Sequence, residues 1–228
     1  LLTAIAGHAA ISIKRSYLFE DVKRSQKETE EAFFYTIQAL ARASEASDED
    51  TGNHIIRVGS YARTIAERLG LPETFCKQIY YFAQMHDVGK IHIPTDILCK
   101  PGKLTEKEWA IVKGHCKTGA KIIGDSPNLQ MAREIALTHH ERWDGSGYPA
   151  GLKGNEIPLA GRITMLVDIY DALRCERAYK PAFDHEKSFA IITWGDSRIQ
   201  PTHFDPQLLE AFKNVHKKFK EISEKFQI

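Results

Sequence analysis

Apolar residues recur at helical spacing along most of this chain, and this pattern predicts a protein built almost entirely from helices. Residues 1 to about 30 read as one long, polar helix with a thin apolar seam that includes Leu18 and Val22. A seam of this kind suits pairing with a partner chain, and it also suits a solvated linker. The first segment is therefore expected to be a helix that lies outside the main core.

A bulkier helical pattern begins at Phe33 and marks the start of a core. We place the boundary between a linker or signalling helix, residues 1–31, and a helical domain, residues 32–228. No alternation of apolar and polar residues is long enough for a sheet, so the expected fold class is all-α. Further helices are predicted at about 53–69, 73–88, 106–124, 127–142, 160–175, 185–194 and 206–225.

Local signals set several helix ends and one long loop. Thr105 with Glu108 has the spacing of a capping box, and Asp205 followed by Pro206 is typical of a helix start. The segment 143–158 contains four glycines and two prolines and predicts the longest loop. A loop of that length inside a compact domain is usually functional.

Composition restricts the partners and the compartment. The 228 residues carry 31 Lys and Arg against 30 Asp and Glu, a formal net charge of +1, which argues against broad binding to nucleic acid or anionic membranes. The four cysteines are far apart and indicate free thiols in a reducing compartment. No membrane span or signal peptide is evident, so we expect a cytoplasmic location. The chain begins at Leu1 rather than Met, which suggests a piece of a longer protein.

One short stretch, His86-Asp87-Val88-Gly89-Lys90, combines a nitrogen ligand, an oxygen ligand and a cation. The two oxygens of Asp87 can bridge two metal ions, and Lys90 can reach an anion held by the metal. Downstream and upstream residues complete a set of candidate ligands, namely His54, His86, Asp87, His115, His139, His140 and Asp168. Imidazole nitrogen with carboxylate oxygen suits Fe, Mn, Zn, Co or Ni.

Most single histidines are surface groups or hydrogen-bonded core residues, and the chain has 10 of them. The adjacent pair His139-His140 and the cluster around His86 raise the case for metal binding. The remaining histidines lack such context and are expected to be structural or solvated, namely His8, His92, His185, His203 and His216.

Several motifs together resemble the HD-GYP domain, a branch of the HD superfamily of metal-dependent phosphohydrolases. The resemblance covers about residues 32 to 215 and rests on a specific combination. The motifs are Asp48-x-x-Thr51-x-x-His54, His86-Asp87-Val88-Gly89-Lys90-Ile91, Lys100-Pro101-Gly102-x-Leu104-Thr105, His115-x-x-x-Gly119, His139-His140-Glu141-Arg142-Trp143-Asp144-Gly145-Ser146-Gly147-Tyr148-Pro149, Asp168-x-Tyr170-Asp171-Ala172-Leu173, Arg177-x-Tyr179-Lys180-Pro181 and His203-Phe204-Asp205-Pro206.

This resemblance implies a helical bundle that holds a binuclear metal centre and hydrolyses the bacterial second messenger cyclic di-GMP. The product would be linear pGpG, and a second round would give GMP. The seven candidate ligands match the metal ligands of the family, with Asp87 as the bridge and Lys90 near the scissile phosphate. Two divalent ions are implied, Fe or Mn foremost, with Zn, Co or Ni as alternatives. Asp50 occupies the position of a third-metal ligand in some members, so a third ion stays open.

The same resemblance implies a set of substrate contacts, namely Lys90, Gly147, Tyr148, Pro149, Asp171, Arg177 and Lys180. Each has a simpler alternative. Tyr148 also suits plugging of a glycine-rich turn, and Arg177 with Lys180 also suits a solvated face. Asp171 suits orientation of a ligand as well as a nucleotide contact, and Trp143 suits anchoring of the loop by packing.

Two alternative functions stay open at this point. One is hydrolysis of another cyclic dinucleotide such as 3′,3′-cGAMP, because Arg174-Cys175-Glu176 departs from the family pattern near the basic contacts. The other is a catalytically silent binding or docking module. The segment Leu1–Ala10 resembles the final helix of a GAF sensor domain. It implies an upstream sensor, and the N-terminal helix implies a homodimer.

Overall fold

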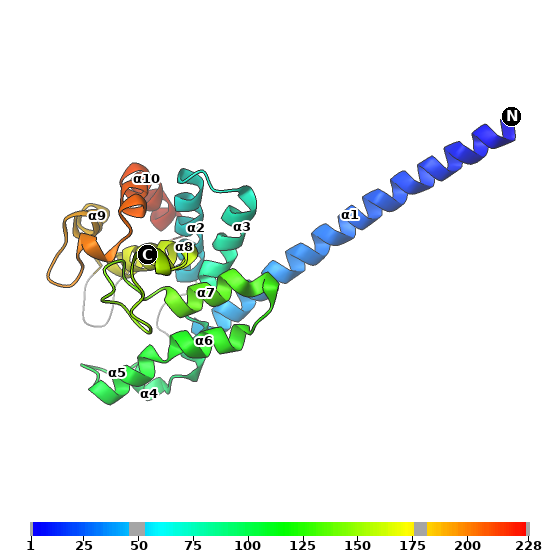
Figure 1. The fold of residues 1–228 in the computed structure, drawn as a ribbon. Coiled ribbons are helices and arrows are strands. Elements are labelled where there is room, and N and C mark those ends of the chain that lie inside the picture. The colour runs from blue at the N-terminus through cyan, green and yellow to red at the C-terminus, as the bar shows by residue number, and fades with distance from the viewer. Residues whose placement is uncertain (1, 46–52, 176–181, 227–228) are drawn as a thin grey trace. The chain divides into compact units, whose positions relative to one another are not determined.

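The computed structural model describes residues 2–45, 53–175 and 182–226, and every regular element within these ranges is a helix (Figure 1). The α-helices are α1 (Leu2–Glu45), α2 (Asn53–Arg68), α3 (Glu73–Phe82), α4 (Thr95–Leu98), α5 (Glu106–Lys113), α6 (His115–Ile123), α7 (Gln130–Thr138), α8 (Leu159–Arg174), α9 (His185–Trp194) and α10 (Pro206–Lys225). Short 3₁₀ helices are η1 (Ala83–Met85), η2 (Val88–His92), η3 (Pro127–Leu129), η4 (Gly154–Glu156) and η5 (Pro201–His203). The all-α prediction is confirmed.

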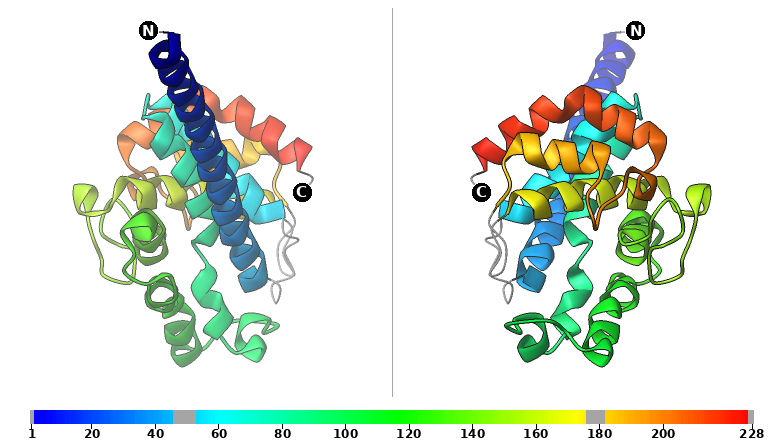
Figure 2. Two further views of the ribbon diagram at one scale, coloured as in Figure 1. Left: turned by 90° about the vertical axis from the view of Figure 1, so that its right-hand side faces the viewer. Right: turned by 90° about the vertical axis from the view of Figure 1, so that its left-hand side faces the viewer.

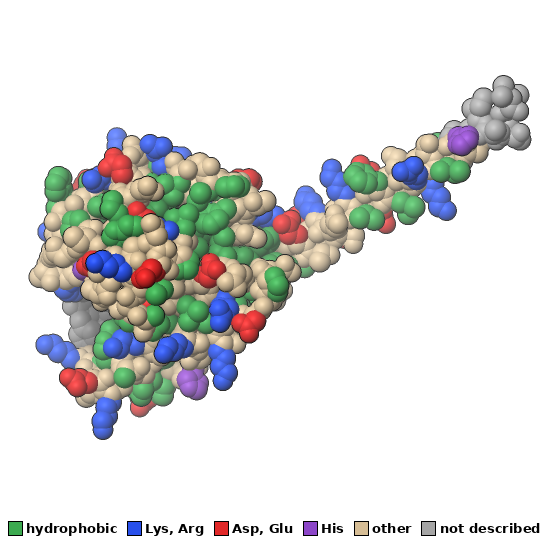
Figure 3. All heavy atoms as spheres, in the orientation of Figure 1, with side chains coloured by type: hydrophobic (Ala, Val, Ile, Leu, Met, Phe, Trp, Pro, Cys, Tyr) green, Lys and Arg blue, Asp and Glu red, His purple; other side chains and the backbone are tan. Residues whose placement is uncertain are grey.

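The chain divides into two units, Leu1–Ile37 and Gln38–Ile228. The division falls inside α1, which continues without a break past the expected boundary at residue 31. Apolar side chains lie among charged ones along the first unit (Figure 3). They include the predicted seam, since Leu18 and Val22 are 52% and 56% exposed. Within the described ranges, no helix has both the length and the apolar character needed to cross a bilayer.

Helix α2 has a central place in the second unit, because it packs against α3, α8 and α10. Helices α9 and α10 lie side by side, as both views in Figure 2 show. An aromatic cluster fills the space between α2, α8 and α10, and it is built around Tyr61, Tyr170 and Phe219. The Tyr61 ring stacks on Phe219 at 4.5 Å and meets Tyr170 edge-on at 5.2 Å. All three side chains are fully buried, so they fix the helix that carries Asp168 against α2.

Two predicted helices are shorter than expected, and both corrections concern metal-ligand candidates. The helix expected at 73–88 ends at Phe82 and continues as η1, so His86 and Asp87 lie in the turn between η1 and η2. The helix expected at 127–142 is α-helical only from Gln130, and it ends at Thr138 just before the His139-His140 pair. In both places a histidine side chain binds back to the last turn of the helix.

The helix expected at 106–124 is divided at Gly114 into α5 and α6. Thr105 and Glu108 form the predicted capping box, with the Thr105 hydroxyl accepting from the Glu108 amide at 3.3 Å. The break places His115 at the first position of a new helix. The predicted helices 185–194 and 206–225 match α9 and α10.

Candidate metal centre and its surroundings

Three candidate ligands use one local device. Each histidine follows the end of a helical turn, and its ring Nδ1 lies against a backbone carbonyl three or four residues earlier. The distances are 2.8 Å from His86 to Ala83, 2.6 Å from His115 to Val112 and 3.0 Å from His139 to Ile135. Because Nδ1 donates to a carbonyl, the lone pair of Nε2 points away from the backbone. The local fold therefore presents three imidazole nitrogens as ligands.

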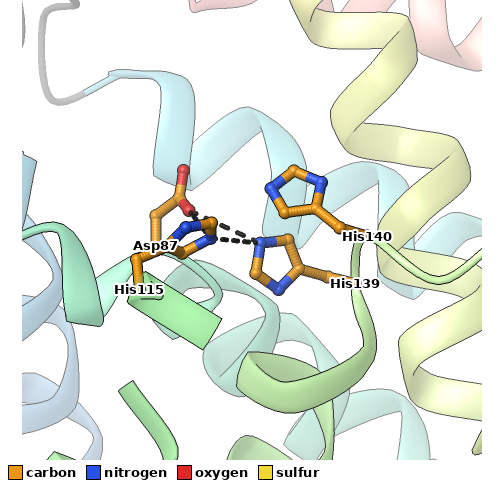
Figure 4. A group of neighbouring side chains, drawn as sticks. All are labelled: Asp87, His115, His139 and His140. Carbon is orange, nitrogen blue, oxygen red and sulfur yellow. Dashed lines mark hydrogen bonds and ion pairs between the residues drawn. The ribbon is translucent and has the colours of Figure 1, made fainter. Parts of the chain in front are cut away.

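The seven candidate ligands gather into two groups, although they come from distant parts of the chain. One group is Asp87, His115, His139 and His140, shown in Figure 4, and the other is His54, His86 and Asp168. In each group the potential ligand atoms lie within 4.8 Å of one another. A separation of that size is compatible with a shared ion at metal–ligand distances near 2 Å.

Asp87 faces both groups. Its Oδ1 lies 3.1 Å from Nε2 of His115 and 3.4 Å from Nε2 of His139. Its Oδ2 lies 3.3 Å from Nε2 of His86 and 2.8 Å from Nζ of Lys90. The two oxygens of one carboxylate therefore point toward different ligand groups, which is the arrangement that a bridging carboxylate needs.

Unsatisfied polar atoms show that these residues fit a cation. His86 Nε2 and Asp87 Oδ1 are buried without a hydrogen-bond partner, a state that costs free energy unless another species occupies the site. Nε2 of His115 and Nε2 of His139 face each other at 3.2 Å. Divalent transition metals in the two groups would accept these lone pairs, and the donor set of nitrogen and oxygen suits such ions.

The pKa shifts within the cluster differ from residue to residue. Burial lowers the pKa of His115, but the Asp87 carboxylate, 3.1 Å from its Nε2, outweighs burial and raises that pKa to about 10. Burial lowers the pKa of His139. Burial, together with the charge of His139, holds the pKa of His140 well below its usual value. Burial opposes ionisation of Asp87, yet the charges of Lys90 and nearby histidines hold its pKa well below the usual range. Asp87 is thus anionic at neutral pH, as a metal ligand must be.

The glycine-rich loop is fastened to the turn that carries the ligands. The buried carboxylate of Glu141 accepts from the amides of Ala150 at 2.7 Å and Leu152 at 3.0 Å. Gly147 lies so close to this turn that a β-carbon would be 2.4 Å from the Arg142 nitrogen and 2.6 Å from the carbonyl oxygen of His140. Only glycine allows this approach, which explains the glycine of the Gly147-Tyr148-Pro149 motif.

Tyr148 lies over one ligand group. Its amide donates to the His140 carbonyl at 3.1 Å, and its ring centroid is 4.7 Å from the His140 ring. The Trp109 ring and the Lys113 ammonium each lie 6.0 Å from the centre of the Tyr148 ring. Burial raises the pKa of Tyr148, so the phenol stays neutral and can donate a hydrogen bond. The structure thus brings Tyr148 to the candidate metal centre, next to an aromatic and a basic side chain from α5.

The surroundings of Asp171 argue against the expected substrate contact. The residue has no exposed surface, and its carboxylate lies 2.6 Å from Nδ1 of His54 and 2.7 Å from Nε of Arg57. A nucleotide cannot reach a carboxylate that is fully enclosed and occupied in this way. The alternative, in which Asp171 orients a ligand, fits the contacts.

Two residues near the site were missed by the sequence reasoning. Arg57 follows His54 by three residues, as Asp171 follows Asp168, so helical spacing was the available signal. Trp109 precedes Lys113 by four residues on α5, and nothing in its local pattern marked it. Three expected site residues lie outside the described residues, namely the third-metal candidate Asp50 and the substrate contacts Arg177 and Lys180.

The fold and the two ligand groups define a helical protein with a candidate metal centre, and its family follows from comparison with known proteins. The chain belongs to the HD domain family, whose model matches residues 23–208. It is 40% identical over 232 residues to a cyclic di-GMP phosphodiesterase of Vibrio cholerae, across 95% of this chain and 46% of that protein. It is 42% identical over 212 residues to the 3′3′-cGAMP-specific phosphodiesterase 2 of the same species, across 92% of this chain and 38% of that protein.

A solved structure of a cyclic GMP-AMP-specific phosphodiesterase from V. cholerae superposes with a TM-score of 0.57 at 18% identity. The match covers 85% of this chain and 52% of that one, and at this identity it supports the fold alone. The chain spans about half the length, or less, of the curated relatives described above.

Proposed function

We propose that this chain is a metal-dependent phosphodiesterase that hydrolyses cyclic di-GMP to linear pGpG. The observation that carries the proposal is Asp87, whose two oxygens face separate ligand groups while Lys90 lies 2.8 Å from one of them. A relative that covers 95% of this chain is a cyclic di-GMP phosphodiesterase, which supports the substrate class. Cleavage of pGpG to GMP is a second step open to the same site.

The proposed cofactor is a pair of divalent transition metal ions, with Fe or Mn foremost. The Asp87 group and the His54 group would each hold one ion, and Asp87 would bridge them. When bound, two such ions supply Lewis acidity at the phosphate and a water molecule of lowered pKa. Asp50 is the proposed residue for a third ion.

In the proposed reaction one water adds to phosphorus and the bond to the ribose 3′ oxygen breaks, which leaves a 5′-phosphate and a 3′-hydroxyl. The ammonium of Lys90 would offset the negative charge that builds on the phosphoryl oxygens. The neutral phenol of Tyr148 can donate a hydrogen bond at the edge of the site, and Trp109 offers a half-exposed ring for a guanine base. Arg177 and Lys180 are proposed as further phosphate or guanine contacts.

A second substrate has an observation in its favour. The relative specific for 3′3′-cGAMP is as similar to this chain as the cyclic di-GMP enzyme is, at 42% against 40% identity. The metal centre acts on a phosphodiester and does not distinguish adenine from guanine. Base-contacting residues must therefore decide the preference. A catalytically silent docking role is disfavoured, because all seven candidate ligands are present and grouped.

We further propose that residues 1–31 transmit the state of an upstream GAF-like sensor in a cytoplasmic protein. The exposed apolar side chains Ile11, Leu18 and Val22 share one face of α1 and support pairing of two copies.

The test is a panel of cyclic dinucleotides offered to the Mn(II)-loaded chain, with initial rates compared among cyclic di-GMP, 3′,3′-cGAMP and cyclic di-AMP. We expect pGpG from cyclic di-GMP and loss of turnover in the double variant His86→Ala, Asp87→Ala. Exclusive turnover of 3′,3′-cGAMP would move the assignment to the second substrate. Unchanged turnover in the double variant would show that catalysis lies elsewhere.

A further inference from the structure

Arg57 and Asp171 form a buried ion pair directly behind a candidate metal ligand. Arg57 on α2 is 1% exposed, and Asp171 on α8 has no exposed surface. Nε of Arg57 donates to one Asp171 oxygen at 2.7 Å, and its Nη2 donates to the other at 2.8 Å. The Asp171 oxygen that accepts from Nη2 also lies 2.6 Å from Nδ1 of His54. Nη2 of Arg57 lies 3.1 Å from Cys175 Sγ. The pair therefore spans two helices and ends on a ligand.

This orienting group differs in kind from those of the other ligands. Nδ1 of His86, His115 and His139 lies against backbone carbonyls, whereas Nδ1 of His54 lies against a carboxylate. A carboxylate partner fixes the imidazole tautomer with hydrogen on Nδ1 and increases the basicity of Nε2. Nε2 of His54 then faces the Asp168 carboxylate at 3.8 Å, inside its own ligand group.

We propose that Arg57 and Asp171 are positioning residues that set the metal affinity of the His54 group separately from that of the Asp87 group. Asp171 holds the ring of His54, and Arg57 holds Asp171 in place and balances its charge in the interior. The proposal rests on the two-metal centre of the proposed function. Backbone carbonyls orient His115 and His139 in the Asp87 group, and a substitution at position 171 leaves these carbonyls intact.

The test measures metal binding rather than turnover. Asp171→Asn keeps the size of the side chain and one oxygen acceptor but removes the negative charge. We expect the wild-type chain to bind two equivalents of Mn(II) and the variant to keep one, with affinity for the second about 10- to 100-fold weaker. Electron paramagnetic resonance gives a second reading, because coupled Mn(II) pairs should give way to the resolved hyperfine pattern of an isolated ion.

Arg57→Lys and Arg57→Met extend the test, and we expect the lysine to retain more of the second ion than the methionine. A matched control is Arg162→Met, which breaks another well-formed ion pair, 2.6 Å from Asp205, on the same helix as Asp171. The control should lose stability in thermal unfolding yet still bind two ions.

Three results would overturn the inference. Two equivalents bound to Asp171→Asn at wild-type affinity would show that the pair does not act on the metal. Loss of both ions in that variant would show that the pair does not act on the metal affinity of the His54 group alone. A single equivalent in the wild-type chain would instead contradict the two-metal centre itself, so failure of the proposed function has its own signature.

Discussion

At Gly89 the turn that carries Asp87 packs closely against the helix that carries His115. A β-carbon on Gly89 would lie 2.0 Å from the carbonyl oxygen of His115 and 2.5 Å from the amide nitrogen of Gly119. Both atoms belong to the backbone, so rotation of a side chain cannot relieve the overlap. We predict that Gly89→Ala loses stability, metal affinity and turnover together.

The magnitude follows from the contact distances. Ordinary van der Waals contact begins at 3.4 Å, so the backbones of η2 and α6 must separate by about 1.4 Å to accept the methyl group. Overpacking of this kind lowers the free energy of unfolding by about 1–3 kcal/mol. This separation of the backbones is also large compared with the 3.1 Å distance between Asp87 Oδ1 and His115 Nε2, so it would displace these two ligand atoms from each other. Misplacement of reacting groups by about 1 Å costs roughly 100-fold in rate.

The assay compares turnover of cyclic di-GMP, bound Mn(II) and the midpoint of thermal unfolding between Gly89→Ala and a matched control. Gly119→Ala is the control, because its methyl group would meet its nearest atoms, on η2 and α7, at 3.2 to 3.4 Å. We expect the control to stay close to wild type in all three measurements. Wild-type stability and turnover in Gly89→Ala would refute the packing argument.

Three further predictions concern single side chains. Lys90→Ala should keep its metal content, measured by mass spectrometry, but its kcat should fall about 100- to 1,000-fold. Removal of one group that stabilises charge in the transition state has an effect of that size. A wild-type kcat would show that Lys90 takes no part in catalysis. Trp109→Ala should weaken substrate binding by about 1–3 kcal/mol, which would appear as a roughly 5- to 150-fold rise in KM with kcat retained. The control is Trp194→Ala, because Trp194 is exposed. Equal KM values for the two variants would exclude stacking of a base on Trp109. Burial lowers the pKa of His185 in the folded chain, so the unfolded chain takes up a proton more readily. The neutral His185 therefore contributes to the free energy of unfolding above about pH 6.5, and this contribution falls as the pH drops below that value. Urea titrations should therefore show a weaker loss of stability in acid for His185→Gln, and identical pH profiles would contradict this.

The fold was largely predictable because it depends on local patterns. Helices that begin at a capping aspartate, such as α9 and α10, matched the predicted ranges. The errors at Gly114 and Thr138 have one cause, because each directly precedes a histidine whose side chain binds back to the helix, and His86 binds back in the same way to Ala83 of η1. Residue periodicity does not record such a contact, so the predicted helices ran on through the ligands.

The site was predictable to a different degree. The seven candidate ligands came from the pattern of histidines and aspartates, and the family resemblance then matched them as a set. The structure arranges those residues in two groups around Asp87. The sequence could not supply the division into groups, because that depends on packing among helices far apart in the chain. The buried environment of Asp171 was equally inaccessible, since its partner Arg57 comes from a helix more than a hundred residues earlier.

The product formed in labelled water tests the central claim most directly. The chain is loaded anaerobically with two equivalents of Mn(II) and given cyclic di-GMP in water enriched in oxygen-18, and the products are identified by mass spectrometry. The account predicts linear pGpG with one labelled oxygen on its 5′-phosphate. Recovery of intact cyclic di-GMP from protein that has bound both metal ions would contradict it.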